Sequence, residues 1–99
     1  MKSITTEELL ELIENGTDFN LVDVRETEEV AYGMIPGATH IPLGLLPEQM
    51  DAFKEGEAYY IICKAGGRSA MACDYLESNG VETVNVEGGM MAWNGEVVA

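Results

Sequence analysis

Apolar and polar residues follow one another along this chain in short segments, some with the spacing of a helix and others typical of a buried strand. Thr5 and Glu8, three residues apart, have the form of a capping box. The apolar residues that follow recur at helical spacing until Gly16 ends the pattern. This spacing predicts a helix over residues 6–14.

Four short runs of mostly apolar residues predict strands. The first run shows no clean alternation of apolar and polar positions, as expected of a strand buried on both faces in a parallel sheet. The third, two tyrosines followed by two isoleucines, is the most β-prone segment of the chain. The predicted strands cover residues 19–24, 38–41, 59–62 and 84–86.

The segments between these runs have helical character. The acidic stretch 26–32 predicts one or two helical turns, and Pro47 stands where a first turn accepts proline, which predicts a helix to about Phe53. Another helix is expected from Ser69 to the stop signal at residues 79–80. Strands alternating with helices predict an α/β domain whose mostly parallel sheet is covered on both faces.

Length, composition and charge narrow the class of protein. Ninety-nine residues predict one domain over 1–99, and 46% hydrophobic with 23% charged residues is a globular balance. The net charge of -13 argues against a nucleic-acid binder and against binding to anionic membranes. The longest apolar run, residues 58–63, is too short to span a membrane, and no signal-peptide core is visible. A cytoplasmic protein is therefore expected.

Cys63 is the candidate nucleophile. It follows the strongest predicted strand, and in open α/β sheets the ligand site lies beyond the carboxyl ends of the strands. A thiol reacts as its thiolate, which helix N-terminal amides and nearby cations favour by lowering the thiol pKa. Two of the five basic residues in the chain, Lys64 and Arg68, lie beside it. A lone cysteine at a strand end is more often a small buried hydrophobe, but these neighbours favour a reactive thiol.

The glycines of the same loop predict a site for an anion. Gly66 and Gly67 allow backbone conformations closed to other residues, so successive amides can turn inward around a negative charge. Arg68 could point its planar fork at an oxyanion or fold over to hold the loop in shape, and both roles stay open. Neither G-x-x-x-x-G-K-[ST] nor G-x-G-x-x-G is present, which disfavours a nucleotide fold. The predicted chemistry needs no metal and no cofactor.

Several segments together resemble the rhodanese family of sulfurtransferases. Residues 63–69, CKAGGRS, resemble the family's active-site loop, C-[RK]-x-G-x-R-[ST]. Residues 21–25 and 33–42 are similar to its D-x-R and G-H-I-x-G-A-x-x-I-P signatures, and residues 88–93 resemble its closing G-G-x-x-x-W element. The order and spacing of these blocks are far more specific than any single one.

The resemblance implies a three-layer fold with a five-stranded, mostly parallel sheet, and a role for Cys63 as the residue that becomes a persulfide. Thiosulfate or a persulfide would be the donor, and cyanide, a thiol or a protein would accept the sulfur. Arg68 would join Cys63 as a catalytic residue. The expected substrate-binding residues are Lys64, Ala65, Gly66, Gly67 and Ser69.

Departures from the family pattern leave alternatives open. Met34 replaces the usual histidine at a site regarded as structural. Lys64 stands where many members have arginine, and it lacks the bidentate fork, so a donor other than thiosulfate is an open possibility. Related phosphatases have five residues between cysteine and arginine, whereas four separate Cys63 from Arg68. A non-catalytic module or a relay of persulfide sulfur between proteins is the other alternative, although inert modules commonly lack the cysteine.

The remaining candidate residues are interpreted as structural. Cys73 falls on the apolar face of the predicted helix after the loop, where a buried core thiol is expected. His40 precedes a proline at a predicted strand end, and thiolate attack on a sulfane sulfur needs no base. Asp23 and Arg25 follow a buried strand and are expected to support neighbouring loops through an ion pair or hydrogen bonds. Trp93 is expected to be a packing residue.

Overall fold

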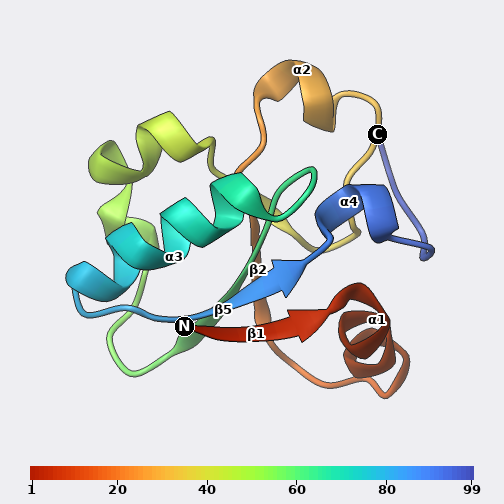
Figure 1. Ribbon diagram of the computed structural model, residues 1–99, viewed down its shortest axis with the longest axis horizontal. Helices are drawn as coiled ribbons and strands as arrows, with labels where there is room; N and C mark the ends of the chain where they lie inside the picture. Colours follow the sequence, from red (N-terminus) through yellow and green to blue (C-terminus); the bar gives the residue numbers. More distant parts are fainter.

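The computed structural model describes residues 1–99 and places five strands in one sheet (Figure 1). Every neighbouring pair of strands is parallel, in the order β1-β5-β4-β2-β3. The predicted α/β fold is confirmed, and the sheet is entirely rather than mostly parallel. The strands are β1 (Lys2–Thr5), β2 (Asn20–Asp23), β3 (Thr39–His40), β4 (Ala58–Ile62) and β5 (Glu82–Glu87).

The helices are short and lie between the strands in the chain. None of them combines the length and the apolar character that crossing a membrane would demand. The α-helices are α1 (Thr6–Glu14), α2 (Thr27–Val30), α3 (Gly67–Ser78) and α4 (Gly89–Ala92), and the 3₁₀ helices are η1 (Leu43–Glu48) and η2 (Met50–Ala52).

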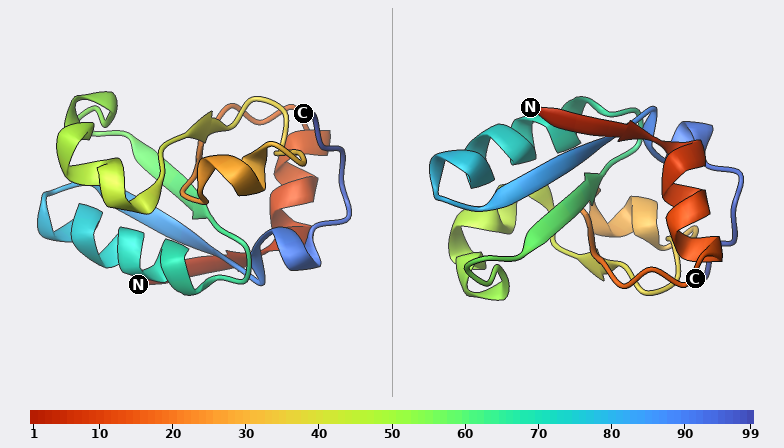
Figure 2. Two further views of the ribbon diagram at one scale, coloured as in Figure 1. Left: turned by 90° about the horizontal axis from the view of Figure 1, so that it is seen from above. Right: turned by 90° about the horizontal axis from the view of Figure 1, so that it is seen from below.

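Two apolar clusters hold helices on opposite faces of the sheet (Figure 2). Leu76 of α3 belongs to the same cluster as Ile61 of β4, and Leu9 of α1 belongs with Ile62 to the other. Each of these side chains is fully buried, which stabilises the fold by about 2 kcal/mol apiece. Because successive residues of a strand point to opposite faces, Cys63 continues the pattern of Ile61 and lies on the α3 face.

The capping box predicted for the first helix is present. The Glu8 amide donates to the Thr5 hydroxyl over 3.1 Å, and the Thr5 amide donates to the Glu8 carboxylate over 2.9 Å. A cap of this kind stabilises a helix by about 1 kcal/mol. Helix α1 consequently spans the predicted residues, Thr6–Glu14.

Strand β1 was absent from the sequence prediction. It is an edge strand that pairs only with β5, and Ile4 is its one partly buried residue. An exposed edge strand needs no apolar run, so its sequence lacks the signal that marks the buried strands. The pairing is nevertheless regular, with Ile4 opposite Val86.

The prediction of a helix that begins at Pro47 and ends at about Phe53 was wrong. Pro47 lies inside η1, and the shorter helix η2 follows it. Proline has no amide hydrogen to give to an α-helical bond. The apolar residues Leu43, Leu46, Met50 and Phe53, all in contact with the α3-side cluster, recur mainly every third residue. That interval matches the three-residue turn of a 3₁₀ helix.

Other element boundaries differ by a few residues. Helix α3 begins at Gly67, two residues before the predicted start, because Gly66 takes a left-handed conformation at the N-cap. Strand β5 covers Glu82–Glu87 and extends beyond the predicted 84–86 at both ends. Its terminal glutamates are exposed, so the apolar pattern marks only its buried centre.

Candidate active site

Cys63 directly follows β4, a central strand of the sheet, and the cysteine loop, residues 63–69, leads from it into α3. In Figure 1 this loop lies between α2 and α4, at the carboxyl edge of the sheet. Only 1% of Cys63 is exposed to solvent. The strand therefore fixes the thiol in position, while the loop determines which groups surround it.

Backbone amides and one hydroxyl surround the sulfur. The Gly66 amide donates to Sγ of Cys63 over 3.1 Å, and the Ser69 hydroxyl oxygen lies 3.3 Å from the same sulfur. The Ser69 hydroxyl also donates to the Gly66 carbonyl over 3.0 Å. Gly66 has a φ of +107°, which L side chains rarely adopt, and this turn brings its amide toward the sulfur.

Gly67 does not have the special conformation that the sequence predicted for both glycines. It is the first residue of α3 and has no positive φ. A Cβ built at Gly67 meets nothing within 4 Å. The anion cradle therefore depends on Gly66 for its backbone turn, and the helical conformation of Gly67 is open to any residue.

The cradle favours the thiolate form of Cys63. Burial is the largest influence and by itself would raise the thiol pKa. The hydrogen bond between Cys63 and the Ser69 hydroxyl, together with hydrogen bonds from the amides of Ser69, Gly66 and Ala65, outweighs it and holds the pKa of Cys63 below its ordinary value. The main favourable contributions are therefore hydrogen bonds, rather than the charges of Lys64 and Arg68 that the sequence emphasised.

Arg68 makes a two-pronged ion pair with Glu29 of α2. Its two terminal nitrogens donate to the two carboxylate oxygens over 2.6 and 2.8 Å. This hydrogen-bonded guanidinium, helped by the amide of Glu26, lowers the pKa of Glu29 to about 2. Of the two roles that the sequence left open, the geometry places Arg68 in the one that holds the loop in shape. Glu29, 39 residues away in the chain, was not among the predicted site residues.

Substituting Glu29 with glutamine should lower the free energy of unfolding by about 1 kcal/mol at pH 7, since a partly exposed bidentate pair is lost. The pKa of Glu29 is lowered from 4.5 to about 2, so the ion pair contributes fully to the free energy of unfolding above pH 4.5. This contribution is lost as the pH falls through 2. Urea unfolding at several pH values would measure this. Glu28→Gln, at an exposed neighbouring position, is the control. A Glu29→Gln effect no larger than the control effect at pH 7 would contradict the prediction.

Lys64, Ala65 and Gly67 form the exposed part of the cysteine loop. The Lys64 side chain makes neither an ion pair nor a hydrogen bond, so its charge is free. The backbone is held from the other side by α4, whose Met90 and Met91 amides donate to the carbonyls of Cys63 and Lys64 over 2.8 and 2.9 Å. The loop is thus fastened between α2 and α4.

Asp23 and Arg25 form a buried ion pair next to the loop. The Arg25 guanidinium donates to both oxygens of Asp23 over 2.8–3.0 Å and to the Gly33 carbonyl over 2.8 Å. Nε2 of His40 lies 2.7 Å from the Arg25 carbonyl oxygen. These bonds tie the end of β2 to β3 and to the segment before it. The bond from Arg25 to Gly33 therefore stabilises the segment between these two residues, which contains Glu29.

Asn85 of β5 is a second residue that the sequence prediction missed. Only 7% of it is exposed, and its amide nitrogen lies 3.5 Å from the Gly66 carbonyl oxygen, while its Oδ1 has no partner. If the Ser69 hydroxyl turns toward a thiolate, Asn85 remains as a donor to that carbonyl. There was one indication of this role in the sequence, because Asn85 is a polar residue inside the apolar predicted strand 84–86.

Cys73 lies apart from this chemistry, in the core beneath α3. It is fully buried, and burial raises the pKa of its thiol. Like Cys63, it is a free thiol. A neutral buried thiol is a poor nucleophile, so Cys73 serves as a packing residue.

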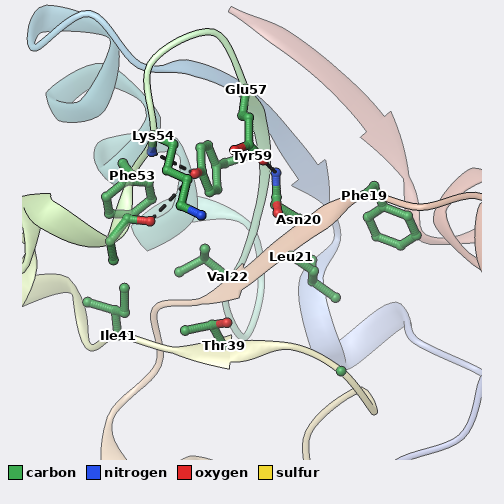
Figure 3. A pocket seen from close by; sticks show the side chains of 12 residues that line it. Phe19, Asn20, Leu21, Val22, Thr39, Ile41, Phe53, Lys54, Glu57 and Tyr59 are labelled. Atoms are coloured by element: carbon green, nitrogen blue, oxygen red, sulfur yellow. Dashed lines mark hydrogen bonds between the residues drawn. The ribbon is translucent and has the colours of Figure 1, made fainter.

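One hollow of the surface with several polar lining residues lies away from Cys63. This hollow of about 270 Å³ lies beside the amino-terminal halves of β2 and β4, between Asn20, Tyr59 and Lys54 (Figure 3). Polar groups that line this hollow already have hydrogen-bond partners within the protein. The Tyr59 hydroxyl accepts a hydrogen bond from the Lys54 amide, and the Asn20 side-chain amide donates to the Glu57 carboxylate. None of its lining residues belongs to the cysteine loop, so it plays no part in the site.

A thiol held by loop amides at the carboxyl edge of a parallel sheet defines an α/β protein with a candidate cysteine nucleophile. Residues 5–96 match the family model described as the rhodanese-like domain. The crystal structure of a rhodanese-like domain protein from Staphylococcus aureus superposes with a TM-score of 0.94 at 47% identity, covering 99% of this chain and 97% of that one. The chain belongs to the family of rhodanese-like domains.

Two curated relatives are similar over almost their full length. YtwF of Bacillus subtilis strain 168 is 52% identical over 96 residues, which cover 97% of this chain and 93% of that protein. A sulfurtransferase of Allochromatium vinosum is 37% identical over 94 residues, covering 94% of this chain and 88% of that protein. The family and these relatives support a transferase of sulfur.

Proposed function

We propose that this protein is a sulfurtransferase that carries sulfane sulfur as a persulfide on Cys63. The donor is thiosulfate or a small persulfide, and the acceptor is cyanide or a thiol. The observation that carries the proposal is the cradle around Sγ, with a Gly66 amide at 3.1 Å and a pKa held below its ordinary value. Such a thiolate is a nucleophile at a pH where an ordinary thiol is mostly protonated.

The reaction consists of two displacements at sulfur. The Cys63 thiolate attacks the outer sulfur of thiosulfate, a new S–S bond forms, and the old S–S bond breaks with its electron pair leaving on sulfite. The acceptor then attacks the outer sulfur of the persulfide, and the electron pair of the broken bond returns to Sγ of Cys63. The enzyme is restored without an external oxidant, reductant, metal or cofactor.

The amides of the cysteine loop suit the intermediate as well as the free thiolate. A persulfide carries its negative charge on the terminal sulfur, and inward-facing amides stabilise charge at that position. The exposed and unpaired Lys64 adds a positive charge at the mouth of the loop. Both features would attract an anionic donor at short range, although the overall charge of -13 repels it at longer range.

A phosphatase is the competing class, and the geometry of Arg68 argues against it. A phosphatase arginine must face the phosphate oxygens, whereas both terminal nitrogens of Arg68 are bonded to Glu29. The test compares two substrates on one preparation of the wild-type protein. We expect thiocyanate from thiosulfate and cyanide, and no release of p-nitrophenol from p-nitrophenyl phosphate. Phosphate ester turnover without thiocyanate would overturn the proposal.

A further inference from the structure

Three large apolar side chains stand exposed around the cysteine loop. Tyr32 is 92% exposed, Met91 is 71% exposed and Met71 is 62% exposed. We call these three residues the apolar collar. Single exposed apolar residues are ordinary on a protein surface, but several around one reactive group mark an interaction site.

Each collar residue lies within one helical turn of a bond that involves the cysteine loop. The Tyr32 amide donates to the carbonyl of Glu29, the partner of Arg68. Met71 follows Arg68 by three residues on α3, and the Met91 amide donates to the Lys64 carbonyl. Figure 1 shows the loop between the helices that carry these contacts, α2, α3 and α4. The collar residues therefore come from three segments that contact the cysteine loop or its Arg68.

The cysteine loop lies outside the hollows of the protein surface. The surface has five hollows, and none is lined by any residue from 63 to 69. Small-molecule sites are usually concave and enclose most of their ligand. A protein partner would supply such walls at this site.

The charge of the protein indicates which charge a protein partner should carry. The net charge is -13, and the exposed residues Glu26 and Glu28 lie at the N-cap and in the first turn of α2, in the same segment as Tyr32. At this edge of the sheet Arg25 and Arg68 are paired with carboxylates, which leaves Lys64 as the free cation. A positively charged partner would be steered toward this surface, whereas a second copy of the same chain would be repelled.

We propose that the apolar collar docks a basic protein that presents a cysteine on a protruding segment to Cys63. This proposal rests on the persulfide function given above and names its acceptor. The partner thiolate attacks the outer sulfur of the Cys63 persulfide, the S–S bond to Sγ breaks, and its electron pair returns to Cys63 as a thiolate. The partner leaves with the new persulfide, and no net oxidation takes place.

The test measures transfer from the preloaded protein to two acceptors. Wild type is loaded with thiosulfate or with a small persulfide donor, freed of excess donor, and mixed with either free cysteine or a short lysine- and leucine-rich peptide that contains one cysteine. Loss of sulfur from the protein is followed by intact mass. We expect the combined variant Tyr32→Ser, Met71→Gln, Met91→Gln to transfer about tenfold more slowly to the peptide, and within about twofold of wild type to free cysteine.

Two controls make the result specific. Ile13→Gln changes an exposed apolar residue of α1, on the opposite face of the sheet from α3, and should leave both rates unchanged. Raising the salt from about 50 mM to about 500 mM should slow transfer to the peptide several-fold, because it screens opposite charges.

The outcomes separate the two proposals. Absence of added sulfur with thiosulfate and with the small persulfide donor alike would overturn the persulfide function and the docking proposal together. Normal loading followed by an unchanged peptide rate in the collar variant would overturn the docking surface alone. Equal slowing with both acceptors would overturn it too, since the collar would then act on the loop. A wild-type dimer that the collar substitutions dissociate, seen by sedimentation, would assign the surface to a second copy instead.

Discussion

The Gly89→Ala variant is expected to unfold at a much lower urea concentration than the wild type and to lose sulfur loading. Gly89 opens α4 with a φ of +56°, and a Cβ there would lie 2.5 Å from the Cys63 carbonyl oxygen and 2.6 Å from the Lys64 carbonyl. These are backbone atoms of the cysteine loop, which cannot rotate away as the end of a side chain can. The left-handed conformation and the overlap together cost about 3 kcal/mol or more.

Gly16→Ala is the matched control for this prediction. Gly16 also has a positive φ, +71°, but a Cβ there meets nothing within 4 Å. Only the left-handed penalty of about 1 kcal/mol applies, and the loop after α1 lies away from Cys63. Equal stability of the two variants, with normal loading by Gly89→Ala, would show that α4 does not hold the cysteine loop in place.

Cys63→Ser is expected to lower thiocyanate formation by at least about a thousandfold. A serine hydroxyl has a far higher pKa than a thiol, and it cannot form the persulfide on which both displacements depend. Serine is close to cysteine in size, so the buried position keeps its shape and the variant should fold. Far-ultraviolet circular dichroism and urea unfolding would establish that the loss is chemical.

Cys73→Ala is the comparison for the nucleophile. Cys73 is equally buried but belongs to the core under α3, and its pKa is raised rather than lowered. Its substitution should reduce stability by about 1 kcal/mol, through the small cavity left behind, while thiocyanate formation is retained. Similar loss of activity in both variants would mean that the two thiols act together.

The parts of the fold that the sequence predicted correctly carry local signals. Helix α1 begins with a capping box formed by two residues that are three positions apart, and β4 is an unbroken run of β-prone side chains. The position of Cys63 then followed from a general rule about parallel sheets, namely that sites lie at the carboxyl ends of strands. In each case the residues that decide the structure are neighbours in the chain.

The parts that the sequence could not predict depend on contacts between distant segments. Arg68 is held by Glu29, 39 residues away, and one acidic residue within an acidic stretch gives no sign of its partner. Asn85 reaches the cysteine loop only because β5 pairs with β4. The edge strand β1 likewise depends on β5, since its exposed residues have no apolar pattern of their own.

The sequence also could not fully predict the hydrogen bonds around Cys63, although the residues involved are close together in the chain. The spacing of glycines and cations predicted an anion cradle, but it assigned the same role to both glycines. Only Gly66 takes the left-handed turn, because it is the N-cap of α3, whereas Gly67 is already helical. Which of two adjacent glycines makes the turn depends on where the helix begins, and that boundary is set by packing of the helix on the sheet.

Intact mass spectrometry after incubation with thiosulfate, and separately with a small persulfide donor, tests the central role of Cys63 most directly. Wild type and Cys73→Ala should each gain one sulfur atom, and Cys63→Ser should gain none. The donor that loads the wild type faster is the preferred one. An unmodified wild type with both donors, or a sulfur atom retained by Cys63→Ser, would contradict the assignment of Cys63 as the sulfur carrier.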